Sequence, residues 1–135
     1  MTHGHRPIEH TADCGIEAWA SDLPGLFEEC AAGMFQLMFS AAPAVASIAV
    51  SATGSTYEEV LVGWLSELLY VAETRGLALS AFIVDRASAE SVEGWVGGVP
   101  PTAARTRGTP IKAVTHHGLK VRHDGVWRAQ VIFDA

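Results

Sequence analysis

The chain has 135 residues, 49% hydrophobic and 18% charged, and its 15 acidic residues against 9 lysines and arginines give a formal net charge of −6. This length and composition predict one folded domain over residues 1–135 and exclude an intrinsically disordered chain. The excess of acidic residues disfavours direct binding to nucleic-acid phosphates and favours binding of a basic partner or a cation. No apolar run reaches the about 20 residues of a membrane span, and residues 1–7 lack the apolar segment of a signal peptide, so we expect a cytoplasmic protein without a membrane anchor.

The first part of the chain predicts a polar tail, a short strand and an amphipathic helix. Residues 1–7 form the tail, and residues 15–19 alternate between small or apolar and larger side chains, as in a strand. Ser21 is the expected N-cap of a helix that reaches about residue 39 and ends before the Ala-Ala-Pro sequence at 41–43. Its apolar face is built from residues three and four positions apart: Leu23, Leu26, Phe27, Cys30, Ala31, Met34, Phe35 and Met38.

A second strand and a longer helix follow. Residues 46–52 alternate as in a half-buried strand, which Gly54 closes. Two capping-box patterns then overlap, because Ser55 and Thr56 are each followed three residues later by a glutamate. The helix ends with Arg75 in its last turn and Gly76 directly after it. Trp64, Leu65 and Leu68 are expected to be buried, and the apolar face that marks the helix consists of Val60, Leu61, Trp64, Leu65, Leu68, Leu69 and Ala72.

The second half of the chain reads as strands and turns. Residues 77–86 predict a strand buried on both faces, residues 92–96 a short strand, and residues 97–110 a mobile loop. The segments 111–115, 119–122 and 127–133 are strand-like, with a hairpin turn at 123–125. Together the elements predict an α+β fold with two amphipathic helices packed on a mixed or antiparallel sheet of about six strands.

Two carboxylates stand at strand ends near the two ends of the sequence. Asp13 lies among small residues, two positions before Gly15, and Asp134 follows the last strand. If the first and last strands are neighbours, both carboxylates and the main-chain carbonyl of Ala135 can converge on an oxygen-lined site suited to a hard cation. The alternative is that Asp13 is an Asx-turn residue and Asp134 a solvated terminal residue.

Other polar residues permit further interpretations. Lys112 in its strand-like segment can reach an acidic group or a nucleotide phosphate of a partner, or simply face solvent, and Glu67 can be an exposed helix former. His10, His116 and His117 could form a zinc or hydrolase site with Asp13, although adjacent histidines in a strand point to opposite faces. A third class is a chaperone-like protein-interaction domain without a cation.

Several blocks of the chain resemble the signature blocks of the archease family, in the family's order and over nearly the whole length. The blocks are His10-Thr11-Ala12-Asp13, Leu26-Phe27-Glu28, Gly33-Met34-Phe35-Gln36-Leu37-Met38, Trp64-Leu65-Ser66-Glu67-Leu68-Leu69 and Ile111-Lys112-Ala113-Val114-Thr115-His116. A hydrophobic strand followed by Asp134 also ends the chain, as it does in archeases.

The resemblance implies an archease-like fold and a non-catalytic protein cofactor. Such a protein promotes guanylylation and repeated turnover of the RtcB-type RNA ligase of tRNA splicing and RNA repair, which joins a 2′,3′-cyclic phosphate or 3′-phosphate end to a 5′-hydroxyl. It also implies a site for a divalent cation, with calcium as the expected metal. Carried over to this sequence, the metal ligands would be Asp13, Asp134 and the main chain of Ala135.

The sequence departs from the family pattern in two places. Ser40 stands where the family often has an aspartate just after the first helix, and Cys14 occupies the place of a usual aliphatic residue. The loss of a negative charge at position 40 weakens any cation site that depends on it, since the number of charged ligands helps set affinity.

Overall fold

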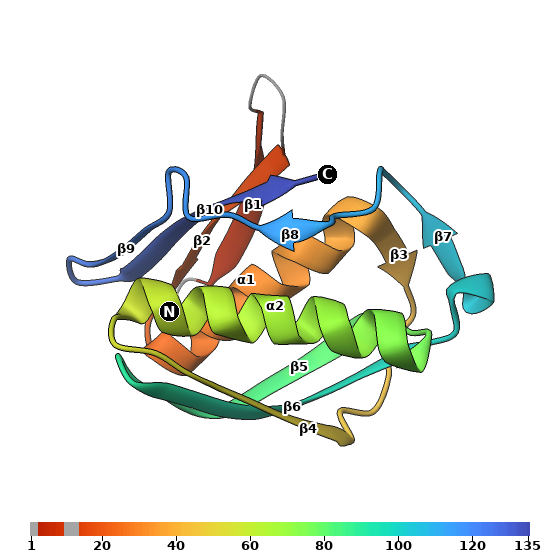
Figure 1. The fold of residues 1–135 in the computed structure, drawn as a ribbon, viewed down its shortest axis with the longest axis horizontal. Helices are drawn as coiled ribbons and strands as arrows, with labels where there is room; N and C mark the ends of the chain where they lie inside the picture. Colours follow the sequence, from red (N-terminus) through yellow and green to blue (C-terminus); the bar gives the residue numbers. More distant parts are fainter. Residues whose placement is uncertain (1–2, 10–13) are drawn as a thin grey trace.

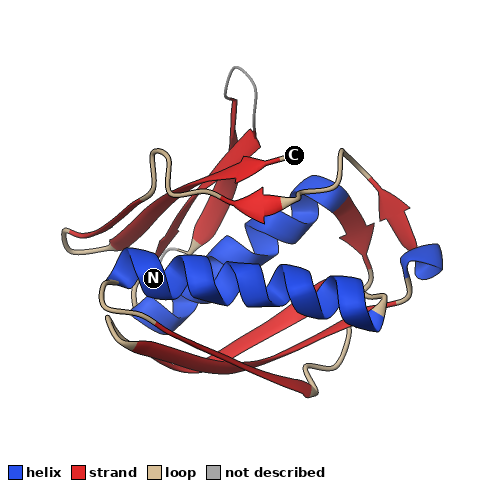
Figure 2. Cartoon of the chain, in the orientation of Figure 1, coloured by secondary structure: helices blue, strands red, loops and turns tan. Residues whose placement is uncertain are grey.

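The structure is a computed structural model and describes residues 3–9 and 14–135. Two helices lie between antiparallel sheets (Figure 1), and Figure 2 shows the same arrangement coloured by secondary structure. The helices are α1 (Leu23–Met38) and α2 (Tyr57–Arg75). The strands of the described residues are β1 (Gly4–Glu9), β2 (Cys14–Ala20), β3 (Phe39–Ala41), β4 (Ile48–Thr53), β5 (Ala78–Ala87), β6 (Ser91–Val99), β7 (Ala104–Thr106), β8 (Ala113–Val114), β9 (Lys120–His123) and β10 (Trp127–Asp134).

The strands form three sheets, and every pair is antiparallel. The largest sheet has the order β1-β2-β10-β8, with β9 also paired to β10. A second sheet has the order β4-β6-β5, and the short strands β3 and β7 pair with each other. The α+β prediction with two helices is therefore confirmed; the sheets are antiparallel and hold ten strands among the described residues, more than the expected six.

The core lies between the largest sheet, the helices and the β4-β6-β5 sheet. Helix α1 packs on β5 and β2, and helix α2 packs mainly on β4. Trp64 of α2 is fully buried and donates its indole N–H to the carbonyl of Phe27 in α1, at 3.2 Å. This bond satisfies the polar group of a large apolar side chain at the helix contact, as a buried tryptophan requires. The described part of the chain contains no helix long and apolar enough to cross a bilayer.

The helix ends follow the sequence signals with one correction. Thr56 is the N-cap of α2, where its hydroxyl accepts from the Glu59 N–H at 3.1 Å, and Gly76 ends the helix in the left-handed conformation (φ 64°). The N-cap of α1 is Asp22, not the expected Ser21, because the Asp22 carboxylate accepts from the Gly25 N–H at 2.7 Å.

Three sequence predictions are wrong. The expected polar tail contains β1, which pairs with β2 along its whole length. The expected mobile loop over 97–110 contains the end of β6, a short 3-10 turn and β7. The strand β5 is not buried on both faces, since Ile83 is 51% exposed and no described helix covers the outer face of its sheet.

Candidate functional site

Strand β10 carries its last residues into a position beside both β2 and β8. Phe133 is fully buried and is paired with Cys14 of β2 on one side and with Val114 of β8 on the other. A fully buried aromatic ring fixes the strand at this point, because withdrawing it from the core would expose its whole apolar surface. The residue that follows, Asp134, is thereby held at a defined place at the edge of the core.

Asp134 has an exposed side chain and an engaged main chain. Its carbonyl accepts from the main-chain N–H of Lys112 at 2.7 Å, and its register partner is Ala113. On the other side of β8, the Thr115 N–H and hydroxyl both donate to the carbonyl of Ile132, at 3.1 and 2.9 Å. These bonds fasten the segment around β8 to β10 and leave the Asp134 carboxylate at the surface, next to the half-buried Ala135.

The structure brings Lys112 to Asp134, and it places other expected site residues elsewhere or does not describe them. Asp13 and His10 lie outside the described residues. Cys14, the next residue after Asp13 in the sequence, is paired with Phe133, the residue before Asp134. Ser40 is exposed in β3, in a different sheet, opposite Arg105 of β7.

Glu67 and the two neighbouring histidines lie on different elements of the fold. The Glu67 side chain is exposed on α2 and makes no hydrogen bond or ion pair to another described residue. His116 and His117 are exposed in the turn that follows β8, between the strand-like segments predicted at 111–115 and 119–122, and Gly118 follows them with φ 67°. Residues 3–9 and 14–135 contain no group of three or more His, Cys, Asp or Glu side chains arranged to hold a metal ion. A metal site built on Asp134 therefore needs donors from the main chain or from residues 10–13.

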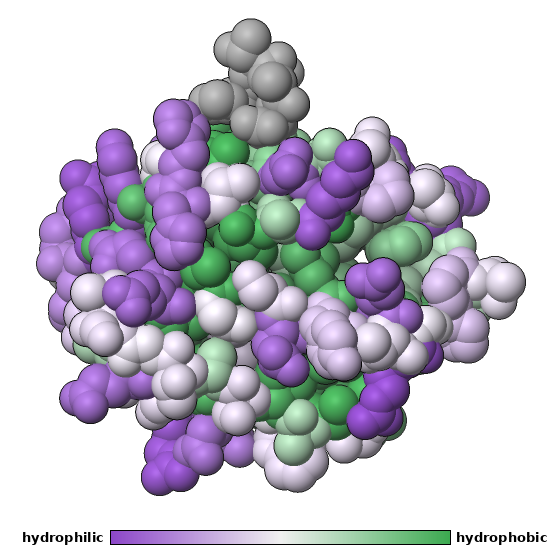
Figure 3. Space-filling model, viewed as in Figure 1, coloured by the Kyte–Doolittle hydropathy of each residue, from purple (hydrophilic) through white to green (hydrophobic). Residues whose placement is uncertain are grey.

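A groove of about 470 Å³ opens beside Lys112. Figure 3 shows hydrophobic residues reaching the surface between the C-terminal half of α2 and the segment that leads to β8. The lining is largely apolar and comes from α1, the start of β3, α2 and the residue Leu77 after it, and the 101–112 segment. Its residues are Phe35, Met38, Phe39, Leu69, Ala72, Leu77, Pro101, Pro110 and Ile111, joined by Glu73 and Lys112. Such a surface, next to an exposed carboxylate and an exposed lysine, can bind a partner's apolar side chains and orient them by charge.

Sequence reasoning missed the polar link between β1 and α1. Both ring nitrogens of His5 lie within hydrogen-bond distance of α1 oxygens, Nδ1 at 2.8 Å from Glu29 and Nε2 at 2.9 Å from Gln36. Glu29 and Gln36 lie seven positions apart, about two turns of one helix face, which was the available signal. Their partner could not be inferred, because it depends on the pairing of β1 with β2.

The chain is therefore a small α+β protein with an exposed carboxylate, Asp134, at the end of β10 and an apolar groove beside Lys112. The sequence of residues 5–135 matches the Archease protein family (MTH1598/TM1083). The chain belongs to the archease family.

The comparisons with individual proteins agree over almost the full length. The archease of Methanopyrus kandleri is 34% identical, with 94% of this chain and 96% of that protein covered. The archease of Methanothermobacter thermautotrophicus is 32% identical, with 97% and 98% covered. The solution structure of Methanobacterium thermoautotrophicum protein 1598 superposes with a TM-score of 0.78 at 28% identity, covering 98% and 99% of the two chains.

A crystal structure from Thermotoga maritima, named an archease and possible chaperone, has a TM-score of 0.62 at 21% identity and covers both chains completely. This likeness shows the shared fold.

Proposed function

We propose that this protein is a non-catalytic activator of an RtcB-type RNA ligase, promoting guanylylation of the ligase and its repeated turnover. The proposal follows from membership of the archease family, as the sequence blocks implied. The observation that carries it is the register of β2 and β10, because the pairing of Cys14 with Phe133 supports a site shared by Asp13 and Asp134. Asp13 directly precedes Cys14 in the chain and Asp134 directly follows Phe133, and consecutive Cα atoms are about 3.8 Å apart.

The donors available at this end fit a hard divalent cation, with calcium as the proposed metal. The described donors are the exposed carboxylate of Asp134 and the main-chain oxygen of Ala135, and Asp13 would add a second carboxylate. Oxygen-only ligand sets of this kind suit Ca²⁺ or Mg²⁺ and do not suit a thiolate-preferring metal. Ser40 adds no charge, so the site has to rely on Asp13, Asp134 and the main chain. When bound, the cation would supply positive charge at this surface.

The residues around Asp134 support docking rather than chemistry on RNA. The Lys112 side chain is exposed and makes no ion pair with another described residue, so its ammonium is available to an acidic group or a nucleotide phosphate of the ligase. The adjacent groove offers apolar contact area, and Glu67 offers a further charge on α2. With a net charge of −6, the protein is poorly suited to holding RNA directly, so its proposed partner is the ligase in the cytoplasm.

Guanylylation of the ligase with GTP, with and without this protein, is the direct test. Asp134→Asn and Asp13→Asn should each remove most of the stimulation while leaving the unfolding midpoint close to wild type, because each substitution keeps the shape and deletes one charge. Asp124→Asn is the matched control, since Asp124 lies in the exposed β9–β10 hairpin and its ion pair with Arg128 at 3.5 Å is of a weak surface type.

Two results would contradict the proposal. Full stimulation by Asp134→Asn and Asp13→Asn in chelator-treated buffer would exclude a cation role for these carboxylates. Absence of stimulation by the wild type would exclude ligase activation itself. Turnover of a phosphoester or peptide substrate by the protein alone would favour the metal-dependent hydrolase, and suppression of aggregation of an unrelated unfolded protein would favour the chaperone-like domain.

A further inference from the structure

Strand β4 is a sheet edge without charge, proline or register shift, whereas each of the other long edge strands in the described chain has at least one protective feature. Its sequence, Ile-Ala-Val-Ser-Ala-Thr over Ile48–Thr53, has no charge and no proline. It pairs with β6 on one side only and has no register shift. Edge strands with free main-chain groups and neither charge, proline nor bulge are templates for pairing with another strand.

The other edges each carry a protective feature. Strand β1 has Arg6 and Pro7, and strand β9 has exposed Lys120 and Arg122. Strand β5 has two register shifts, and its Val84 N–H donates to the carboxylate of Glu28 at 2.8 Å. Strands β3, β7 and β8 are only two or three residues long. The absence of any such feature on β4 therefore calls for a binding partner.

The register identifies which main-chain groups of β4 are free. The Gly54 N–H donates to the Glu90 carbonyl at 3.0 Å, so Gly54 is a hydrogen-bonded position of the β4–β6 pair. Hydrogen-bonded positions alternate in an antiparallel pair, so Val50 and Ala52 also face β6, whereas Ala49, Ser51 and Thr53 direct their N–H and C=O groups to the open side. These last three residues also have exposed side chains, and all three are small.

We propose that β4 pairs with β4 of a second copy of this chain, antiparallel about a two-fold axis at Ser51. Ser51 then faces the partner's Ser51, and Ala49 faces the partner's Thr53. The three facing pairs exchange about six main-chain hydrogen bonds, since each hydrogen-bonded pair of an antiparallel ladder exchanges two. The result is a continuous six-stranded sheet, and the interface is isologous, as closed two-fold symmetry requires.

The charges around β4 favour this antiparallel pairing with a second copy. The acidic residues Glu59 and Glu90 lie at the Thr53 end, whereas residues 42–50 at the Ala49 end carry no ionisable side chain and Val45 is 81% exposed there. A carboxylate near Ala49 is that of Asp85 on β5, which accepts the indole N–H of Trp95, the register partner of Ala49. Antiparallel pairing sets the Glu59 and Glu90 end of each copy against residues 42–50 of the partner, which carry no ionisable side chain. It also keeps the two Glu59 and Glu90 ends apart by about 13 Å or more, beyond the Debye length of about 8 Å at physiological salt. Parallel pairing would bring the acidic ends together.

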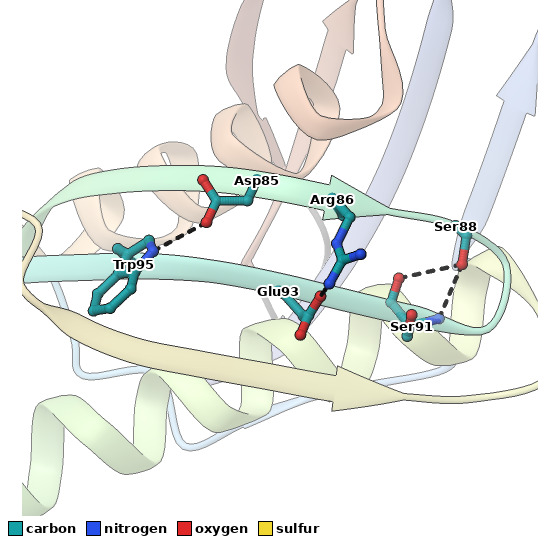
Figure 4. A network of polar contacts seen from close by, with 6 residues as sticks. All are labelled: Asp85, Arg86, Ser88, Ser91, Glu93 and Trp95. Atoms are coloured by element: carbon teal, nitrogen blue, oxygen red, sulfur yellow. Dashed lines mark hydrogen bonds and ion pairs between the residues drawn. The ribbon is translucent and has the colours of Figure 1, made fainter.

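The charged residues beside the proposed axis lie on β5 and β6. Ser51 is paired across the sheet with Glu93, and the Glu93 carboxylate forms an ion pair with Arg86 of β5 (Figure 4). On the same outer face, Trp95 donates its indole N–H to the Asp85 carboxylate at 3.0 Å. The Arg86–Glu93 pair is therefore neutral beside Ser51, whereas Asp85 leaves one negative charge on this face and the whole chain carries −6. Because that net charge repels a second copy, association should strengthen as salt rises; a basic peptide partner would show the opposite dependence.

Disulfide trapping tests the register directly. Facing residues in a hydrogen-bonded antiparallel pair have Cα atoms about 5.5 Å apart, within the range that a disulfide spans. Ser51→Cys should therefore form a covalent dimer under mild oxidation, whereas the matched variant Ala49→Cys should not, because the two copies of residue 49 would be about 13 Å apart. The wild type, with Cys14 and Cys30, gives the background.

Sedimentation equilibrium tests the dimer without a cross-link. The wild type should be dimeric at high concentration, and Ser51→Lys should shift dissociation to at least tenfold higher concentration without changing the unfolding midpoint. Ser51→Pro should act likewise, because the Ser51 N–H faces the open edge and its loss breaks no β4–β6 bond. Thr106→Lys, on the short strand β7, adds the same charge at another exposed strand residue and should leave the dimer intact. A wild type that stays monomeric at every concentration, or equal cross-linking by Ser51→Cys and Ala49→Cys, would overturn the proposal.

Discussion

Glu28 shows how one side chain closes a sheet edge at an electrostatic cost. Its carboxylate lies half-buried on α1 and accepts the Val84 N–H of β5 at 2.8 Å. Burial raises the pKa of Glu28 above its usual value, the bond from Val84 acts in the opposite direction, and the nearby Asp22 and Glu29 carboxylates add to the rise. The ionised form is therefore disfavoured in the folded state relative to the unfolded chain.

The substitution Glu28→Gln should reveal this cost as a pH dependence. The amide keeps an oxygen for the Val84 N–H and carries no charge. Since the folded pKa of Glu28 is raised, the wild type should gain stability relative to the variant as pH falls from neutral through the folded pKa to the unfolded value near about 4.3. Urea unfolding of both proteins at neutral and acid pH measures the difference. A difference that favours the wild type more strongly at neutral pH would show that the sign is wrong.

Cys30 is the second residue whose chemistry is set by its place in the fold. It is completely buried, and burial raises the pKa of its thiol, with the neighbouring Glu29 carboxylate adding to the effect. A buried, protonated thiol is a packing group rather than a nucleophile. The inert thiol of Cys30 is consistent with our proposal that this protein has no catalytic residue.

At the scale of elements, α2 depends on its N-cap. The Thr56 hydroxyl accepts the Glu59 N–H, and the Glu59 carboxylate in turn accepts the Ser55 N–H at 3.3 Å. Thr56→Ala should lower the free energy of unfolding by about 1 kcal/mol, because the first turn loses an acceptor for one of its unpaired N–H groups.

Ser55→Ala is the matched control for Thr56→Ala. It removes a hydroxyl one residue earlier and leaves the Ser55 main-chain bond in place, so its effect should be no more than a few tenths of a kcal/mol. Equal losses in chemical denaturation would show that position 56 has no special capping role.

Elements with local sequence signals were predicted correctly, whereas elements that depend on distant contacts were not. Helix α2 was predicted well because its cap, its apolar spacing and Gly76 are all local signals. Strand β1 was missed because Arg6 and Pro7 read as a tail, and only pairing with β2 makes them an edge strand. The exposure of Ile83 was missed because an apolar run does not reveal that one face of its sheet lacks a covering helix.

At the scale of the whole molecule, the core joins elements from both halves of the chain, and Leu68 lies fully inside it. Leu68→Ala should lower the free energy of unfolding by about 2–5 kcal/mol, through lost burial and the cavity left behind. Leu69→Ala, at a half-buried neighbour, should cost less. Thermal or denaturant unfolding of the two variants and the wild type measures these losses. An unchanged midpoint for Leu68→Ala would contradict the assignment of this position to the core.

The candidate site was predictable only in part, because it also depends on contacts between segments that are distant in the sequence. Asp134 stood out at the end of a strand, and Lys112 was singled out as exposed, but nothing local indicated that the Lys112 N–H binds the Asp134 carbonyl. The apolar groove draws on α1, α2 and the 101–112 segment, so it exists only after tertiary packing. The nearness of Asp13 to Asp134 remains a prediction.

The position of β10 also orders events during synthesis of the chain. This strand lies between β2 and the strands β8 and β9, so the largest sheet lacks its central member until residues 127–134 have left the ribosome. The helices and the β4-β6-β5 sheet draw on residues 23–99 and can associate earlier. Until β10 is available, one side of β2 has no partner strand, and contacts between segments as distant in the sequence as β2 and β10 form slowly. A nascent chain stalled before residue 127 should therefore be the form of this protein that is most dependent on chaperones.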